Sequence, residues 1–225
     1  MAFPRFRPVA DHAVLVEFSD AISDAAHGAV LRLDRAIAAQ PFDGFVEAVP
    51  AYVNILVRFD PLVTDHDVVE AALRHMQTDG TAPVAQGAMH EVLVCYDADF
   101  AQDLAEVARL TDMTPEAVIA AHLAGEYRVY LYGFAPGYAY LAGVPEPLRL
   151  PRKPVARRGV AAGSVIVAGP QCIVTTLTMP TGWWVLGRSP TRILTGESAR
   201  PFLFDVGDRV RFRRISREEF GHADG

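Results

Sequence analysis

Three short apolar runs in the first 80 residues have the composition of β-strands. Residues 13–18 read AVLVEF, and residues 45–49 and 52–59 are two further runs that Pro50 separates. Val, Ile, Phe and Tyr are residue types that strands favour, so their density in these runs predicts three strands in this part of the chain.

Two longer segments carry a helical period. Apolar residues recur every three or four positions between residues 26 and 37, which predicts a helix that ends before Pro41. Thr64 with Asp67 three residues later resembles a capping box, and a second amphipathic segment follows it. The resulting order, β-α-β-β-α, is most of a split βαβ domain, which we assign to residues 1–80.

The second part of the chain begins with a break in this pattern. Residues 81–90 contain glycine, proline and small residues without periodicity, which predicts a linker. Residues 91–225 carry short apolar runs punctuated by glycine and proline, a pattern typical of a β-barrel or β-sandwich. Helix starts are predicted near Asp99 and at Thr114, where proline and glutamate follow a capping threonine. The predicted fold class is therefore α+β.

Charge is distributed unevenly along the chain. The 21 lysines and arginines and 27 acidic residues give a net charge of −6. No acidic residue lies between Glu146 and Glu197, a segment that holds seven basic residues. A field of one sign concentrates carboxylate or phosphate ligands, so this segment predicts a site for a small anion, with solvated surface arginines as the alternative. Nucleic-acid binding is not expected of a chain that is acidic overall.

Several functional classes find no support in the sequence. Residues 159–187 are uncharged over a length that could cross a bilayer, but their glycines, prolines and threonines favour buried strands, and no membrane contact is expected. No phosphate-binding loop, dinucleotide fingerprint or histidine metal motif occurs, so neither a nucleotide nor a metal is predicted on this chain itself. Cys95 and Cys172, without a signal peptide before them, predict a reducing, cytoplasmic location.

A segment rich in glycine and aromatic residues, at 132–143, is a candidate for a binding site. Glycines let a ligand approach the backbone, and aromatic side chains exclude water around it. An aromatic turn that closes a barrel end is the alternative. The candidate ligand-binding residues in this segment are Gly133, Phe134, Pro136, Gly137, Tyr138 and Tyr140.

A string of motifs runs through the predicted barrel in a fixed order. The motifs are GFAPGYAYL at 133–141, PR at 151–152, AGSV at 162–165, AG at 168–169 with Gln171, GW at 182–183 and GRSP at 187–190. This string resembles the signature of the B-type subunit of 5-oxoprolinase, a family also called allophanate hydrolase subunit 1 or KipI-like. Positions similar to the family extend over essentially the whole chain.

The resemblance implies a small α/β domain followed by a cyclophilin-like β-barrel. It also implies partners, because members usually act with a C-type (KipA-like) subunit. In the bacterial oxoprolinase an A-type subunit joins them, and the complex uses ATP to open 5-oxoproline to L-glutamate. With no nucleotide motif here, we expect ATP to bind elsewhere in the complex or across a shared interface. Two alternatives are a subunit of a biotin-dependent urea or amide carboxyltransferase or allophanate hydrolase-like complex, and an inhibitor of a histidine kinase.

Position and chemistry suggest roles for further residues. We expect Arg152, Arg157 and Arg188 to bind the anionic substrate, since guanidinium groups form bidentate bonds with carboxylates. Ser164 and Gln171 are expected to hydrogen-bond its polar groups. A strand can point only one of two adjacent indoles inward, so Trp183 is expected at the site. No catalytic residue is assigned.

The chain also departs from the family pattern. Ile166, Ile173 and Thr181 stand where the family has glycines. Ile173 belongs to a segment, Cys172–Thr176, that differs from the family pattern throughout. β-Branched residues do not comfortably adopt positive φ, and their side chains would crowd a ligand on the backbone. We therefore expect a divergent member, with two alternatives: its substrate differs, or its activity is lost while partner binding remains.

Overall fold

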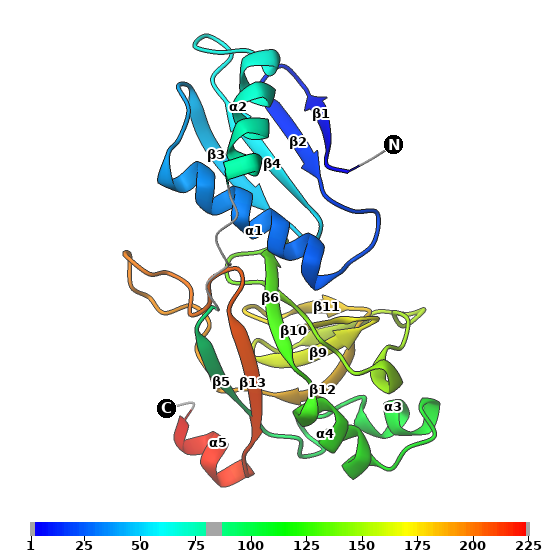
Figure 1. Ribbon diagram of the computed structural model, residues 1–225. Helices are drawn as coiled ribbons and strands as arrows, with labels where there is room; N and C mark the ends of the chain where they lie inside the picture. Colours follow the sequence, from blue (N-terminus) through cyan, green and yellow to red (C-terminus); the bar gives the residue numbers. More distant parts are fainter. Residues whose placement is uncertain (1–2, 80–86, 224–225) are drawn as a thin grey trace. The chain divides into compact units, whose positions relative to one another are not determined.

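The structure is a computed structural model that describes residues 3–79 and 87–223. The chain divides into two compact units, Met1–Gln86 and Gly87–Gly225 (Figure 1). Of the predicted linker, residues 81–86 lie outside the described residues, and a strand begins within its last part, at Met89. Each unit has its own sheet and core.

The first unit is an antiparallel sheet with two helices on one face (Figure 1). Its strand order is β1-β2-β4-β3. The elements are β1 (Arg5–Val9), β2 (Ala13–Glu17), α1 (Asp24–Ala39), β3 (Phe45–Pro50), β4 (Asn54–Phe59) and α2 (His66–Asp79). Alternate residues of β2 and β4 pack against the apolar stripes of the helices, so the spacing that predicted α1 also describes the face it buries.

Two details of the first unit differ from the prediction. Strand β1 was not predicted, because its two arginines and Pro8 hide its strand character, yet it pairs with β2 along its whole length. Proline is tolerated there because β1 is an edge strand. The predicted capping box is also wrong: the Val68 N–H donates to Asp65 Oδ1 at 3.0 Å, so Asp65 caps α2.

The second unit contains a seven-stranded sheet that curls into a nearly closed barrel. The strand order is β12-β9-β10-β7-β6-β13-β5, and a separate pair, β11-β8, lies beside it. Its strands are β5 (Met89–Val94), β6 (Tyr127–Tyr132), β7 (Ala139–Ala142), β8 (Arg157–Val160), β9 (Ser164–Ala168), β10 (Gln171–Val174), β11 (Met179–Thr181), β12 (Trp184–Arg188) and β13 (Arg209–Arg214). Its helices are α3 (Leu104–Leu110), α4 (Pro115–Ala124), the short 3₁₀ helix η1 (Glu146–Leu148) and α5 (Arg217–Ala223).

Of the helices of this unit, α4 begins where the sequence predicted a helix, whereas α3 and α5 do not. Thr114 caps α4 by accepting from the Ala117 N–H at 3.2 Å, as predicted. The start predicted near Asp99 is wrong, because α3 begins at Leu104, and α5 was not predicted at all. Among the described residues, no helix has both the length and the apolar composition that crossing a bilayer requires. The predicted fold class is confirmed.

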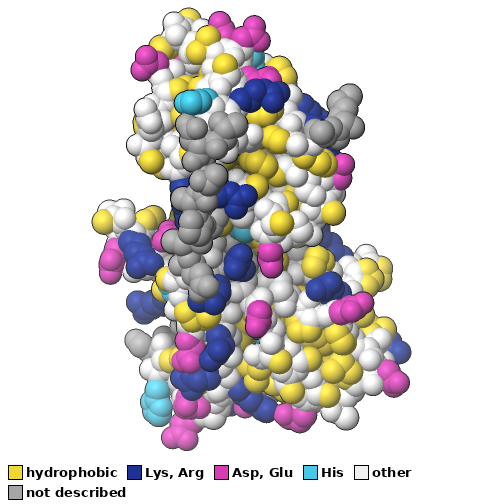
Figure 2. Space-filling model, in the orientation of Figure 1, with side chains coloured by type: hydrophobic (Ala, Val, Ile, Leu, Met, Phe, Trp, Pro, Cys, Tyr) yellow, Lys and Arg dark blue, Asp and Glu magenta, His cyan; other side chains and the backbone are white. Residues whose placement is uncertain are grey.

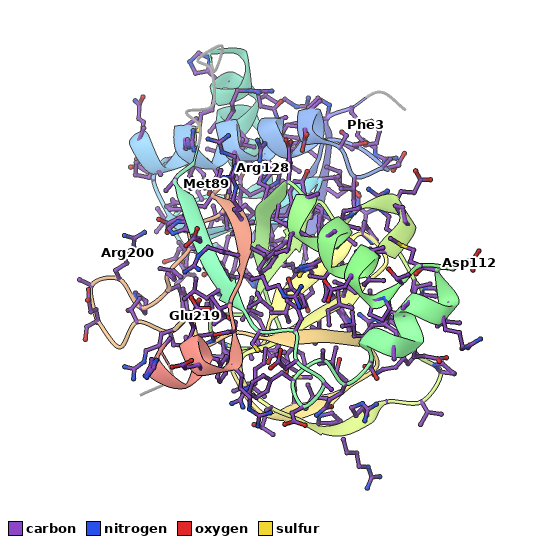
Figure 3. All side chains as sticks on the ribbon, turned by 90° about the horizontal axis from the view of Figure 1, so that it is seen from below. Phe3, Met89, Asp112, Arg128, Arg200 and Glu219 are labelled. Atoms are coloured by element: carbon purple, nitrogen blue, oxygen red, sulfur yellow. The ribbon has the colours of Figure 1, made fainter. Side chains whose placement is uncertain are left out.

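Part of the seven-stranded sheet is buried on both faces. Along β9 every residue is buried: Val165 and Val167 face a large core with Trp184, whereas Ile166 and Ala168 face a smaller cluster with Trp183. Side chains fill the interior between the curved sheet and helices α3 and α4 (Figure 3). As expected, Trp183 and Trp184 point to opposite faces of the sheet. Both faces are covered at this point, so both indoles are buried.

The barrel closes where β12 meets the residue that follows β5. The Cys95 N–H donates to the Arg188 carbonyl at 2.8 Å, and the Arg188 N–H donates to the Cys95 carbonyl at 2.9 Å. A Cβ on Gly187 would lie 2.7 Å from the Cys95 carbonyl oxygen and 2.8 Å from a methyl carbon of Val94. The closure therefore requires glycine at position 187.

We predict that Gly187→Ala destabilises the second unit by about 1–3 kcal/mol, because the added methyl group pushes β5 and β12 apart. Both tryptophans lie in this unit, so tryptophan fluorescence during urea unfolding reports on it alone. Gly221→Ala is the control, since a Cβ there meets nothing within 4 Å. Equal unfolding midpoints for the two variants would show that the closure tolerates a side chain.

Candidate functional site

The glycine and aromatic segment forms the turn between β6 and β7. Phe134 has a φ of +72° and is 72% exposed, an unusual combination for a bulky residue. Gly137 also has a positive φ, and a Cβ there would lie 2.7 Å from the Leu194 side chain. The Thr176 hydroxyl donates to the Pro136 carbonyl at 2.7 Å, which ties this turn to the segment after β10. Phe134 is thus held outward on a braced loop.

The remaining aromatic candidates pack together behind this turn. The rings of Phe134 and Tyr138 are 5.3 Å apart, and the Tyr138 hydroxyl donates to the Met179 sulfur at 2.7 Å. Burial raises the pKa of Tyr138 to about 12. Tyr140 packs edge-on against Trp183, with ring centroids 6.0 Å apart. Their buried rings form a rigid support for the turn.

The three arginines expected to bind the anion are not brought together. The Arg152 guanidinium lies 5.6 Å from the centre of the Trp183 ring. Arg157 Nη2 donates to Asp103 Oδ1 at 2.8 Å, and Arg188 lines a separate pocket. Only Arg188 is therefore both near a cavity and free of a carboxylate partner among the described residues.

Asp103 is the buried centre of an ion network that sequence reasoning missed. Besides Arg157, its carboxylate accepts from Lys153 Nζ at 2.5 Å and from the Val185 N–H at 2.9 Å. Burial alone would raise the pKa of Asp103, but the hydrogen bonds from Lys153, Val185 and Arg157 together hold it below its usual value. Lys153 and Arg157, two of the seven basic residues of the predicted anion segment, therefore neutralise Asp103 and are less available to a ligand.

Two expected polar ligands are part of the framework. The Ser164 hydroxyl donates to the Ala161 carbonyl at 2.8 Å, and its N–H donates to Thr175 Oγ1 at 3.0 Å. Gln171 begins β10, where it pairs with Ala142 and Ala168. Neither residue lines the pocket beside Arg188.

The departures from the family pattern do not strain the backbone. Ile166, Ile173 and Thr181 lie in strands β9, β10 and β11, and none has a positive φ. The two isoleucine side chains are buried in the cluster that contains Tyr138 and Trp183. Side chains thus occupy the space on this face of the sheet that glycines would leave open.

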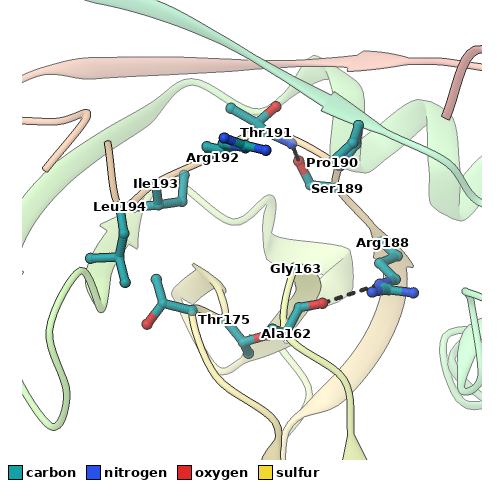
Figure 4. Close-up of a pocket in the computed structure, with 11 residues that line it drawn as sticks. Ala162, Gly163, Thr175, Arg188, Ser189, Pro190, Thr191, Arg192, Ile193 and Leu194 are labelled. Atoms are coloured by element: carbon teal, nitrogen blue, oxygen red, sulfur yellow. Dashed lines mark hydrogen bonds between the residues drawn. The ribbon is translucent and has the colours of Figure 1, made fainter. Parts of the chain in front are cut away.

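The pocket beside Arg188 has a volume of about 230 Å³ and lies at the end of β12 (Figure 4). Arg188 Nε donates to the Ala162 carbonyl at 3.1 Å, and the guanidinium packs over the rings of Phe100 and Phe220 at 5.7 and 5.5 Å. The aromatic contacts and the carbonyl fix the direction of this side chain. The pocket residues are Ala162, Gly163, Thr175, Thr176, Arg188, Ser189, Pro190, Thr191, Arg192, Ile193 and Leu194.

Several arginines elsewhere in this unit are paired with acids. Arg213 contacts Glu91 at 2.9 Å, and Arg214 contacts Glu116 at 2.7 Å. Figure 2 shows basic and acidic side chains interspersed on the side of the second unit where β5 and β13 lie. By contrast, the described lining of the Arg188 pocket contains no acidic residue.

A buried histidine and thiol form a second polar cluster. His122 Nδ1 lies 2.7 Å from the Tyr96 hydroxyl, and its Nε2 lies 3.8 Å from the Cys172 sulfur. Burial lowers the pKa of His122 to about 3 and raises the pKa of the Cys172 thiol. Both groups are therefore neutral at physiological pH, the opposite of an activated thiolate and imidazolium pair. Within the described residues, no three His, Cys, Asp or Glu side chains converge as a metal site would require.

Comparison with known proteins gives matches over almost the whole chain. The family described as carboxyltransferase domain, subdomain C and D, matches residues 4–204. The B-type subunit of 5-oxoprolinase from Bacillus subtilis strain 168 is 34% identical over 221 residues, 93% of this chain and 92% of that protein. The corresponding B-type subunit from Escherichia coli O157:H7 is 32% identical over 205 residues, 91% of this chain and 93% of that one.

Solved structures with the same fold include longer chains. The crystal structure of TTHA0988 is 35% identical, with a TM-score of 0.81 over 92% of this chain, which spans 40% of that chain. The urea carboxylase of Kluyveromyces lactis is 16% identical, with a TM-score of 0.72 over 96% of this chain, which spans 22% of that chain. The second likeness shows the fold alone.

We predict that Asp103→Ala destabilises the second unit by about 3–5 kcal/mol, because it leaves the buried Lys153 ammonium without its carboxylate. Asp103→Asn, which retains a carbonyl acceptor for the Val185 N–H, should cost less. Urea unfolding followed by tryptophan fluorescence measures both. Glu106→Ala is the control, since that carboxylate pairs only with Arg109 on the surface of α3. A loss in Asp103→Ala no larger than in the control would contradict the network's structural role.

We also predict that the second unit loses stability as the pH falls from 6.5 towards 3. In the unfolded chain His122 has its ordinary pKa of 6.5, whereas burial lowers its pKa to about 3 in the folded chain. Between these values only the unfolded chain binds the proton, so protonation favours unfolding. The loss from this residue is about 3 kcal/mol at pH 4.5. In His122→Gln, unfolding midpoints measured from pH 7 to 4.5 should fall less steeply than in the original chain. Parallel pH profiles would show that His122 is not responsible.

Proposed function

The chain belongs to the family of carboxyltransferase domains, subdomains C and D, and we propose that it is the B-type subunit of a heteromeric 5-oxoprolinase. In this proposal the complex opens 5-oxoproline to L-glutamate with ATP, and a C-type subunit shares the site. The observation that carries the proposal is the identity of 32–34% to proteins named as the B-type subunit of 5-oxoprolinase, over 72–93% of this chain.

The chemistry of the barrel unit supports this role. 5-Oxoproline is an anion at neutral pH, and the Arg188 pocket offers a guanidinium without a carboxylate partner among its described neighbours. Arg157 is less suited to the substrate because it already neutralises Asp103. We assign the anion contact to Arg188, and we place the exposed Phe134 turn on the side from which a second subunit completes the site.

The two buried thiols are poor candidates for the reacting nucleophile. Burial raises the pKa of both Cys95 and Cys172, so each remains a protonated thiol near neutral pH. In our proposal this chain binds and orients the lactam, and a partner subunit holds the ATP. Purified alone, the chain is expected to be inactive.

The proposal predicts ATP-dependent release of L-glutamate from 5-oxoproline when the chain is combined with the C-type and A-type subunits of its own host. Arg188→Gln should lower kcat/KM at least about tenfold, since it removes a charge-assisted contact. The barrel closure uses only the backbone of Arg188, so this side-chain change spares it. Arg109→Gln, the same charge change on the surface of α3, should leave the rate unchanged.

Each negative outcome has a defined meaning. If the assembled complex releases no glutamate, the oxoprolinase assignment is wrong, and turnover with a biotinylated carrier protein and urea tests the carboxyltransferase alternative. If glutamate forms and Arg188→Gln matches the original chain, the reaction is right and the assignment of Arg188 is wrong. If the tagged chain is purified from a lysate of its host and a histidine kinase, instead of enzyme subunits, is found bound to it, that result would favour the inhibitor alternative.

A further inference from the structure

The Arg188 pocket is lined by two arginines and, among the described residues, by no acidic side chain. Arg192 lies along the opposite side of the pocket from the Arg188 guanidinium (Figure 4). In the described part of the chain, neither arginine forms an ion pair with an acidic side chain. Two guanidinium groups without a carboxylate repel each other, and a bound anion relieves this repulsion.

Two of the four hydroxyl groups of the pocket can also donate, whereas the Thr175 and Thr176 hydroxyls already donate to the Ala161 and Pro136 carbonyls. The Ser189 oxygen accepts from the Thr191 N–H at 3.1 Å, and the Thr191 hydroxyl oxygen accepts from the Leu93 N–H at 3.1 Å. Each of these two hydroxyls has thereby used an acceptor position and retains a proton to donate. A ligand that fits must supply several acceptor oxygens.

Backbone N–H groups on two sides of the pocket already have partners. The Gly163 N–H donates to the Thr175 carbonyl at 2.7 Å, and the Ser189 N–H donates to the Gly163 carbonyl at 2.8 Å. These N–H groups cannot form the backbone cradle that holds nucleotide phosphates. Anion binding therefore depends on the side chains, above all on the two guanidinium groups.

Size and apolar lining narrow the ligand further. A volume of about 230 Å³ lies below the range of about 300–1,000 Å³ that is usual for drug-sized ligands, so the pocket suits only a small molecule. Ile193 and Leu194 supply apolar wall beside the cations. A small organic acid has both parts that this lining matches: a carboxylate for the arginines and a hydrocarbon portion for the aliphatic side chains.

We propose that this pocket binds the carboxylate of a small organic acid between Arg188 and Arg192, with Arg192 as a substrate-binding residue in its own right. The inference deepens the proposed function and rests on it for the identity of the acid. Arg192 is exposed, so its side chain can swing onto the carboxylate when the ligand arrives. Arg188, fixed by the Ala162 carbonyl and two aromatic rings, provides the rigid half of the clamp.

The test is calorimetric titration of 5-oxoproline into the full chain and into the assembled complex. 2-Pyrrolidinone, the same lactam ring without the carboxylate, is the matched ligand control and should bind at least about tenfold more weakly. Arg192→Gln should weaken 5-oxoproline binding about tenfold and leave 2-pyrrolidinone binding unchanged, whereas Arg109→Gln should change neither. Rising salt should weaken the binding of 5-oxoproline only.

The result separates this inference from the proposed function. Arginine-dependent binding of 5-oxoproline without glutamate release by the complex would support the pocket and refute the reaction. Glutamate release with an unchanged KM in Arg192→Gln would support the reaction and overturn the role of Arg192. Tighter binding of inorganic phosphate than of 5-oxoproline, or no binding to either the chain or the complex, would overturn the carboxylate assignment.

Discussion

The closure of the barrel in the second unit depends on hydrogen-bond partners for the backbone groups at the outer edge of β12. An unpaired strand edge exposes N–H and C=O groups that must find partners. Here Cys95 pairs with Arg188 through two backbone bonds, and Asp103 pairs with Val185 through its N–H and its carboxylate. A curled sheet thus becomes nearly closed without a full strand on this side. The absence of a side chain at Gly187 permits the close approach.

This closure also decides which cations are available to a ligand. Asp103 accepts from Val185 as a buried carboxylate, and a buried negative charge needs counter-ions, which Lys153 and Arg157 supply. Arg188 takes part in the closure through its backbone alone, and its side chain is held beside the pocket by the Ala162 carbonyl and two aromatic rings. The basic segment of the sequence is consequently divided between cations held in the Asp103 network and cations that line the pocket, and net charge alone cannot show the division.

The features that the sequence predicted correctly are those that depend on residues close together in the chain. The helical spacing of α1, the cap of α4 and the fold class all follow from short-range preferences, whereas β1 escaped because Pro8 and two arginines mask an edge strand. The pairing of Asp103 with Lys153 and Val185 spans 50 and 82 residues, and His122 lies 50 residues from Cys172. No local pattern reports such contacts. They arise only when the barrel closes, so Arg157 could not be distinguished from Arg188 by sequence.

The distribution of chemistry in the second unit is consistent with a binding role. The buried Cys172 and His122 are held neutral, because the apolar core disfavours both the thiolate and the imidazolium. The charged groups in the described lining of the pocket are two guanidinium cations, which attract and orient an anion but do not attack a carbonyl carbon. A pocket of this kind lowers the free energy of a bound acid and fixes its direction. The relatives of this chain are named as one subunit of an enzyme. In our proposal the reacting groups therefore lie on another subunit, and this chain recognises the acid.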